Sequence, residues 1–239
     1  MRAPRGRTFG ERALDFFGNL QSPRDLPAGI RVMNPYRDPR VWRYVKEFFR
    51  RYFADNAPRT PVLGINPGRF GAGVTGVMFT DPVALESFCG IRNDLVKRRE
   101  TSSEFVYEFI QRRGGPDAFF REFFLTAVSP LGFLRNGRNC NYYDDPRLLA
   151  RVTPFIVRTL NAQLELGISR NAAIVLGSGA NHRFLAALND ERGFFRTLYP
   201  LEHPRFIMQY RRKRLAQYYD EYARTFDAAR SAAARLVQA

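Results

Sequence analysis

A glycine-rich segment over residues 64–79 holds the side chains with the clearest capacity for chemistry. Its sequence is GINPGRFGAGVTGVMF, and it follows a short apolar run. Asn66 carries an amide that can accept and donate hydrogen bonds, and Pro67 restricts the backbone next to it. Gly68 lets a ligand approach the backbone closely, and Phe79 can offer an aromatic face to a flat base. These residue types predict a site for a planar ring, with an Asn-Pro-Gly turn and a core phenylalanine as the structural alternative.

Two other patterns resemble a cofactor-binding motif and a nucleophile motif, but neither has the flanking elements or residues that its motif requires. Residues 71–76 match the dinucleotide-binding pattern GxGxxG. That pattern needs its glycines at the turn from strand to helix, whereas here Asn66 and Pro67 leave the strand first and the next helix is predicted near Pro82. Ser178 lies between two glycines but lacks the GxSxG elbow of a serine hydrolase, so we expect it to begin the following helix. The sequence therefore predicts no cofactor.

The charge of the chain points to a polyanionic partner. Its 38 Lys and Arg residues outnumber 23 Asp and Glu residues, which gives a net charge of +15 and a pI near 10.5. Such an excess favours nucleic acid over an anionic membrane surface. The basic residues are almost all arginine, so a compositional bias is the alternative; the lysines are Lys46, Lys97 and Lys213.

Cysteine and histidine are too scattered to predict a metal centre. Cys89 and Cys140 lie far apart, as free thiols in a reducing compartment do, and with His182 and His203 they show no zinc spacing. Two cysteines alone cannot ligate an iron–sulfur cluster. No apolar stretch approaches the roughly 18 residues of a membrane span, and the basic start lacks a secretory signal. We therefore expect a cytoplasmic protein without metal, iron–sulfur cluster or membrane partner.

Strand and helix patterns alternate along the chain. Short apolar runs predict buried strands over residues 60–66, 123–131, 172–176 and 194–201. Apolar residues at helical spacing predict helices over residues 41–56, 82–89, 104–113, 152–166, 181–189 and from 215 onward. The alternation predicts an α/β fold, a three-layer α/β/α sandwich with a central, mostly parallel four-stranded sheet. We expect one domain over residues 1–239 and a monomer, with a flexible basic tail at 1–10 and a terminal helix at 227–239.

Polar residues follow the ends of the predicted strands. Asn66, Ser129, Ser178 and His203 each lie at or just past a strand end. Ligands of parallel α/β sheets bind at the carboxyl ends of the strands. These four positions are therefore predicted to face one site.

Several ordered strings resemble the uracil-DNA glycosylase superfamily. The segment at 64–79 resembles the first motif of the single-strand-selective monofunctional uracil-DNA glycosylases, and its GINPG part also resembles the mismatch-specific thymine/uracil glycosylases. Further strings resemble a bacterial branch of the first group. They are NPY at 34–36, AVSPLGF at 127–133, NYYD at 141–144 and LEHPRFIMQYRRK at 201–213. The strings lie in order over most of the chain.

The resemblance implies a role for each motif residue. Asn66 would orient the attacking water, His203 would donate to uracil O2 as negative charge develops, and Phe79 would stack on the base. Gly68 would leave room for a substituent at uracil C5. The backbone of the first motif would line the base pocket at Gly64, Ile65 and Pro67. None of the lysines falls in a strand-end loop of this pocket, so we expect hydrolysis without a Schiff base.

The chain departs from the family pattern in two places. Where the family has an asparagine that reads the uracil edge, this chain has Ala127, so Ser129 or Asn141 is expected to read the base, with Asn139 and Thr126 as weaker candidates. The segment after His203 is apolar and then basic, which predicts a loop that wedges into DNA and holds phosphates. The expected DNA-contacting residues are Arg205, Phe206, Ile207, Met208, Gln209, Tyr210, Arg211, Arg212 and Lys213.

The sequence thus predicts a monofunctional DNA glycosylase. It would flip uracil, or a C5-modified uracil, out of DNA and hydrolyse the N-glycosidic bond, which leaves an abasic site for base excision repair. Its partner would be DNA that contains uracil or a related damaged base. The alternatives are a mismatch-specific thymine/uracil-type glycosylase and a catalytically silent DNA-binding module of the same fold.

Overall fold

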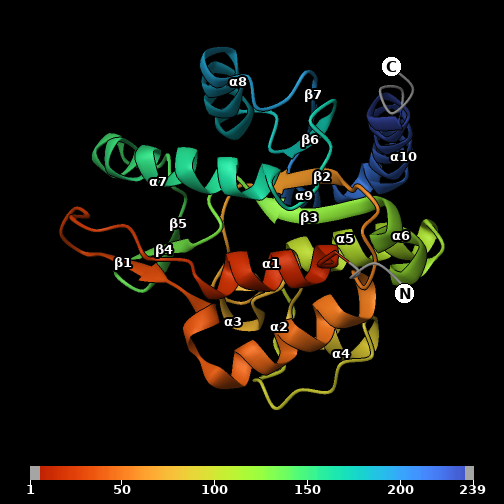
Figure 1. Cartoon of the computed structure of the whole chain (residues 1–239), viewed down its shortest axis with the longest axis horizontal. Helices are drawn as coiled ribbons and strands as arrows, with labels where there is room; N and C mark the ends of the chain where they lie inside the picture. The colour runs from red at the N-terminus through yellow and green to blue at the C-terminus, as the bar shows by residue number, and fades with distance from the viewer. Residues whose placement is uncertain (1–5, 235–239) are drawn as a thin grey trace.

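A four-stranded, all-parallel sheet forms the centre of the molecule. The structure is a computed structural model, and it describes residues 6–234. The strands lie in the order β3-β2-β6-β7 (Figure 1). Every residue of β2, β3 and β6 is buried, as expected for strands covered on both faces. Their bounds are β2 Thr60–Gly64, β3 Phe123–Ala127, β6 Ala173–Leu176 and β7 Leu198–Leu201.

Helices cover both faces of the sheet, which confirms the predicted three-layer α/β/α sandwich. In Figure 1, α7 and α8 lie above the sheet, α1, α2 and α4 lie below it, and α6 lies at its right-hand end. The helices are α1 Phe9–Gly18, α2 Pro39–Tyr52, α3 Ala72–Thr75, α4 Pro82–Ser87, α5 Thr101–Arg112, α6 Gly115–Glu122, α7 Pro146–Leu164, α8 Ala180–Arg192, α9 Pro204–Tyr210 and α10 Leu215–Ala234. Short 3₁₀ turns lie at η1 Pro35–Arg37 and η2 Arg212–Arg214.

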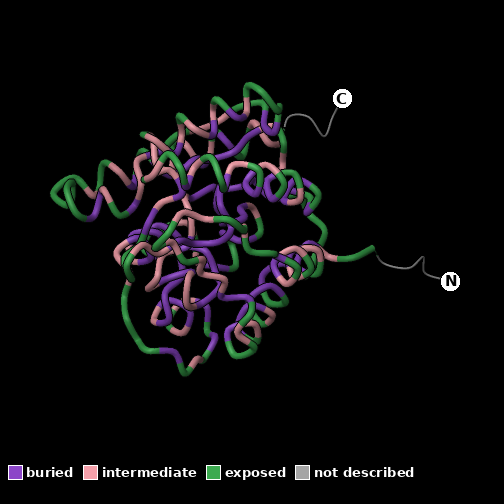
Figure 2. Tube along the Cα trace, turned by 90° about the vertical axis from the view of Figure 1, so that its left-hand side faces the viewer, coloured by how far each residue is buried: buried purple, intermediate pink, exposed green. Residues whose placement is uncertain are grey.

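The core below the sheet is rich in aromatic rings. Phe48 of α2 and Phe53, which directly follows that helix, pack on Phe120 of α6, with ring centroids 5.1 and 5.8 Å apart. Phe109 of α5 packs on Phe226 of α10 at 4.8 Å. Buried residues, drawn in purple in Figure 2, run through the middle of the trace, while exposed segments lie mostly on its outside. These contacts pack α2 against α6 and α5 against α10.

A second, antiparallel sheet was not predicted from the sequence. It has the order β1-β4-β5, with β1 at Ile30–Met33, β4 at Gly132–Arg135 and β5 at Arg138–Cys140. Asn136 and Gly137 join β4 to β5 with φ of 49° and 73°, as a two-residue hairpin of type I′ requires. The predicted strand over 123–131 is therefore too long: β3 ends at Ala127, and the chain turns before β4.

The ends of the chain differ from the expected tail and terminal helix. Thr8 and Glu11 form a capping box at the start of α1, so the fold already includes residues 8–10. Residues 1–5 lie outside the described residues. Helix α10 runs without a break through residue 227 to Ala234, and residues 235–239 lie outside the described part.

Among residues 6–234, no helix is both long and apolar enough to cross a membrane. Cys89 and Cys140 are both buried and free, as their separation predicts.

Candidate active site

A small pocket lies where the carboxyl ends of β2 and β7 meet their loops. Its volume is about 130 Å³, close to the roughly 150 Å³ of a cavity that holds one benzene ring. The lining comes from the loop after β2, the segment before α4, the start of α5, the β5 region and the start of α9. The lining residues are Ile65, Asn66, Pro67, Gly68, Ala72, Met78, Phe79, Glu100, Ser102, Asn139, Asn141, His203 and Arg205.

Asn66 is held in one orientation by backbone groups of a distant segment. Its Oδ1 accepts a hydrogen bond from the Tyr142 N–H at 3.1 Å, and its Nδ2 donates to the Cys140 carbonyl at 3.3 Å. A carbonyl oxygen has two lone pairs, so Oδ1 retains one for a ligand. The antiparallel sheet, through β5, thus fixes the amide that the sequence singled out.

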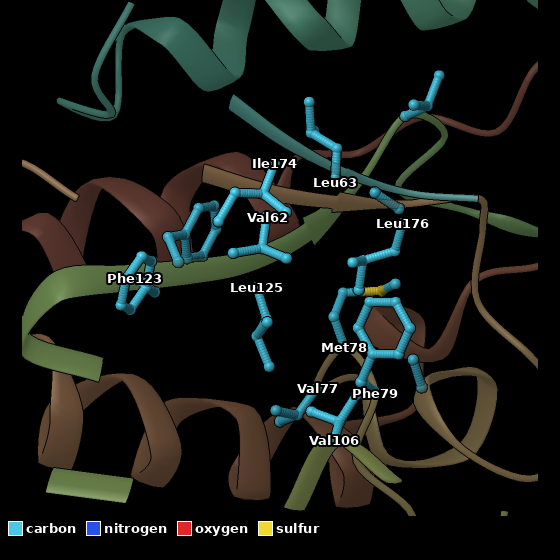
Figure 3. Packing of buried hydrophobic residues seen from close by; sticks show 14 of the residues in the cluster. Val62, Leu63, Val77, Met78, Phe79, Val106, Phe123, Leu125, Ile174 and Leu176 are labelled. Carbon is cyan, nitrogen blue, oxygen red and sulfur yellow. The ribbon is translucent and has the colours of Figure 1, made fainter. Parts of the chain in front are cut away.

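Phe79 sits in the pocket wall in a conformation that few residues adopt. Its φ is 56°, and its ring lies 6.1 Å from the His203 ring at an interplanar angle of 42°. A Cβ on Gly64 would come within 2.6 Å of Phe79 Cζ, so this glycine makes room for the ring. Gly64 therefore lies behind Phe79 and is not among the lining residues, contrary to its predicted place in the pocket. Figure 3 shows the Phe79 ring among Met78, Val77 and Val106.

His203 caps helix α9 and points its other ring nitrogen away from the cap. Its Nδ1 accepts a hydrogen bond from the Arg205 backbone N–H at 3.1 Å. Burial, and then the positive charge of Arg205, lower the pKa of His203 to about 4. The ring is therefore neutral near pH 7, and with Nδ1 as the acceptor its proton lies on Nε2. Nε2 is left as a hydrogen-bond donor.

Glu100 lines the pocket although the sequence did not indicate it. A Cβ on Gly68 or on Gly71 would overlap its carboxylate oxygens, so the carboxyl packs directly on the glycine-rich loop. Its backbone N–H donates to Asp81 Oδ2 at 2.8 Å. Burial, and then the charge of Asp81, raise the pKa of Glu100 to about 7 against the opposing effect of Arg205. The paired glycines are the one sequence signal of this contact, and they do not say which side chain fills the space.

The sequence predicted open space beside Gly68, and the structure contradicts this prediction. Glu100 occupies the position that a Gly68 side chain would take.

The candidates for base reading divide into two groups. Ser129 is fully buried and donates to the Leu131 carbonyl, and Thr126 is fully buried and donates to Gln163, so neither reaches the pocket. Asn139 and Asn141 do line it. Ser129 is therefore wrong as a base reader, because its side chain turns into the protein where β3 ends.

Ser178 also lies away from the site and does not cap α8. The N-cap of α8 is Gly179, and the Ser178 hydroxyl donates to Glu202 at 2.6 Å.

Comparison with known proteins identifies the family. The family model of the Uracil DNA glycosylase superfamily matches residues 51–227. This span contains the pocket residues from all its segments. The chain belongs to the uracil-DNA glycosylase superfamily.

A solved member of similar structure carries the name SMUG2. The crystal structure of wild-type SMUG2 from Pedobacter heparinus is 40% identical in sequence and has a TM-score of 0.90. The match covers 92% of this chain and 97% of that one. A search of curated proteins found no match. The chain is thus a SMUG-like DNA glycosylase, a hydrolase of the uracil-DNA glycosylase type that acts on DNA.

In this glycosylase the segment after His203 is a helix and not the predicted loop. Helical geometry turns Ile207 and Met208 into the core, at 0% and 9% exposure, so neither can wedge into DNA. Tyr210 is 65% exposed, and Phe206 packs between the Tyr210 ring at 5.3 Å and the Arg211 guanidinium at 5.1 Å. The exposed polar residues of the segment are Arg205, Gln209, Arg211, Arg212 and Lys213.

A second cavity of the glycosylase adjoins the base pocket and shares Glu100, Asn139 and Arg205 with it. We call it the arginine cavity. It has a volume of about 500 Å³ and is lined by Arg69, Phe70, Arg98, Arg99, Glu100, Thr101, Arg138, Asn139, Arg205 and Gln209. The Phe70 ring lies 3.5 Å from the Arg98 guanidinium and 4.4 Å from that of Arg69.

Within residues 6–234 of the glycosylase, no three His, Cys, Asp or Glu side chains are grouped so as to hold a metal ion.

Proposed function

We propose that this glycosylase binds uracil flipped out of DNA and hydrolyses its bond to deoxyribose, which leaves an abasic site. The observation that supports this most directly is that Asn66 and Phe79, from the two ends of the glycine-rich segment, and His203, from the start of α9, line one pocket of about 130 Å³. A pocket of that size suits one pyrimidine ring and excludes the rest of a base pair, so the base must leave the stack.

Asn66 would hold the attacking water. Its amide is neutral and weakly basic, so its contribution would be position and not proton removal. The free lone pair of Oδ1 would accept from the water, whose oxygen bonds to C1′ while the electrons of the N1–C1′ bond leave with uracil. The water proton passes to solvent.

His203 would stabilise the charge that uracil acquires. As negative charge develops on O2, the Nε2–H of the neutral imidazole donates a hydrogen bond to it, in the manner of an oxyanion hole. Phe79 would hold the plane of the base.

The reaction would stop at the abasic site. A lyase step needs an amine nucleophile to form a Schiff base. No lysine is among the residues that line the base pocket in the described part of the chain. Of the lysines, Lys97 is held by Glu86 and Asn93, and Lys213 is exposed in η2.

The DNA strand would follow the basic surface beside the pocket. We infer that phosphates next to the flipped nucleotide enter the arginine cavity, and that exposed Tyr210 fills space in the DNA near the flipped base. C5-modified uracils would be secondary substrates, since their substituent would have to displace Glu100.

The test uses end-labelled oligonucleotides that carry one uracil, either single-stranded or paired with guanine or adenine. Strand breaks at uracil that need alkali are expected with the wild-type protein and not with Asn66→Ala. Asn161→Ala, at an exposed asparagine of α7, is the matched control and should retain activity. A parallel substrate with a G·T mismatch tests the mismatch-type alternative. Breaks without alkali would contradict the monofunctional assignment, and tight binding without base release would contradict the proposed reaction.

A further inference from the structure

Glu100 has no part in the reaction as derived above, yet it stands at the junction of the base pocket and the arginine cavity. It is the N-cap residue of α5, and its backbone is tied to Asp81. Its carboxyl is held against the glycine-rich loop at Gly68 and Gly71. The position is therefore fixed from two sides, and the side chain cannot easily turn away from a bound base.

Several other polar groups of the pocket already have partners within the protein. Asn66 bonds to the backbone of the β5 region through both ends of its amide. Asn141 Nδ2 donates to Asp144 at 3.1 Å, and Asn139 Oδ1 accepts from the Arg69 N–H at 3.0 Å. The Glu100 carboxyl makes no hydrogen bond to any other residue in the described part of the chain. It is thus a polar group with its hydrogen-bonding capacity left for a ligand.

Charged and titratable groups of both cavities surround Glu100. One carboxylate, Asp81, opposes its ionisation, and Arg205 favours it. His203 shares the base pocket with it and is neutral near pH 7 because burial lowers its pKa to about 4. The remaining charged groups lie in the wall of the arginine cavity and are Arg69, Arg98, Arg99 and Arg138.

We propose that Glu100 contacts the flipped base, and that its neutral carboxyl donates a hydrogen bond to a carbonyl oxygen on the base. This inference rests on the proposed function. Uracil presents carbonyl oxygens and gains negative charge as its bond to deoxyribose breaks. A protonated carboxyl can donate to such an oxygen, whereas an ionised carboxylate has only acceptors and repels the departing anion. Glu100 is then a base-contacting residue whose protonation controls the rate.

The consequence is a loss of activity at alkaline pH. Because the pKa of Glu100 is raised to about 7, the neutral form prevails below that pH and the ionised form above it. If the ionised form is inactive, the single-turnover rate should fall about tenfold for each pH unit above the pKa. A side chain that offers neither the donor nor a carboxylate, as in Glu100→Ala, should lower the single-turnover rate by about tenfold at any pH.

The experiment measures single-turnover release of uracil from a single-stranded oligonucleotide between about pH 5 and about pH 9. The wild-type rate is expected to fall through neutral pH. Glu100→Gln keeps an N–H donor and cannot ionise, so its rate should stay level and exceed the wild-type rate at alkaline pH. Glu100→Ala should be level but slower. Glu104→Gln, on the same helix and outside both cavities, should reproduce the wild-type profile.

The outcomes separate this inference from the proposed function. An alkaline fall that persists in Glu100→Gln would overturn the role of Glu100, as would complete inactivity of a folded Glu100→Gln, since the carboxylate itself would then be required. Thermal unfolding establishes that each variant is folded. Failure of the wild-type protein to release uracil at any pH would instead refute the proposed function, and the inference with it.

Discussion

Replacement of His203 is expected to separate catalysis from helix capping. One ring nitrogen accepts from the Arg205 N–H and caps α9, and the other is the donor assigned to the base. His203→Asn keeps a good capping side chain but has no donor at the position of Nε2, whereas His203→Ala loses both functions.

The magnitudes follow from these contacts. Loss of an oxyanion-type donor lowers the rate by about 10²–10³, so both variants should release uracil that much more slowly. Loss of an N-cap costs about 1 kcal/mol, which corresponds to a fall in Tm of roughly 2–4 °C for a protein of this size. Only His203→Ala should show it.

The pH dependence of stability gives an independent check. The pKa of His203 is lowered to about 4 in the fold, whereas an unfolded histidine titrates near 6.5, about its ordinary value. Between these values the unfolded chain binds more protons than the native protein, so native stability falls as pH decreases through this window. The full contribution is roughly 3 kcal/mol, and about 2 kcal/mol of it should be lost between about pH 7 and about pH 5. It should be absent from both variants.

The assay combines single-turnover uracil release at neutral pH with urea unfolding at about pH 7 and about pH 5. A His203→Asn rate within about threefold of wild type would refute the assigned donor, since it is far below the expected loss. Equal stability of the Asn and Ala variants would refute the capping contribution.

Four other substitutions test the surroundings of the pocket. Gly64→Ala should lower the rate of uracil release by about tenfold or more with the fold retained, because its Cβ would come within 2.6 Å of Phe79 Cζ; circular dichroism and single-turnover kinetics measure this, and an unchanged rate would contradict it. Tyr210→Ala should weaken DNA binding without loss of stability, whereas Ile207→Ala should lower the free energy of unfolding by about 2–5 kcal/mol because that side chain is fully buried. Binding titration and urea unfolding distinguish them, and the reverse pattern would place the wrong side chain on the DNA face. Arg98→Ala should weaken DNA binding and reduce the slope of log affinity against log salt by about 1 if its guanidinium holds a phosphate; an unchanged slope in fluorescence anisotropy would remove Arg98 from the DNA path.

Local patterns in the sequence determined the parallel sheet and part of the site. The runs that contain β2, β3 and β6 are mostly apolar, because strands covered on both faces need no polar side. Asn66, Phe79 and His203 could be named because each lies in a string that resembles a motif of the uracil-DNA glycosylase superfamily. The hairpin from β4 to β5 was also readable in principle, since Asn136-Gly137 is a strong turn signal.

Tertiary structure alone decided which side chains line the pocket. Glu100 enters the pocket because the start of α5 packs on the glycine-rich loop. No residue close to Glu100 in the sequence indicates that contact. Ser129 follows a strand end but turns inward to a backbone carbonyl. In α9, Ile207 and Tyr210 looked alike as apolar residues after a histidine, and only the helix and its packing sent one inward and the other outward. Spacing along the chain specifies local hydrogen bonding and periodicity, whereas contacts between distant segments depend on how the whole core packs.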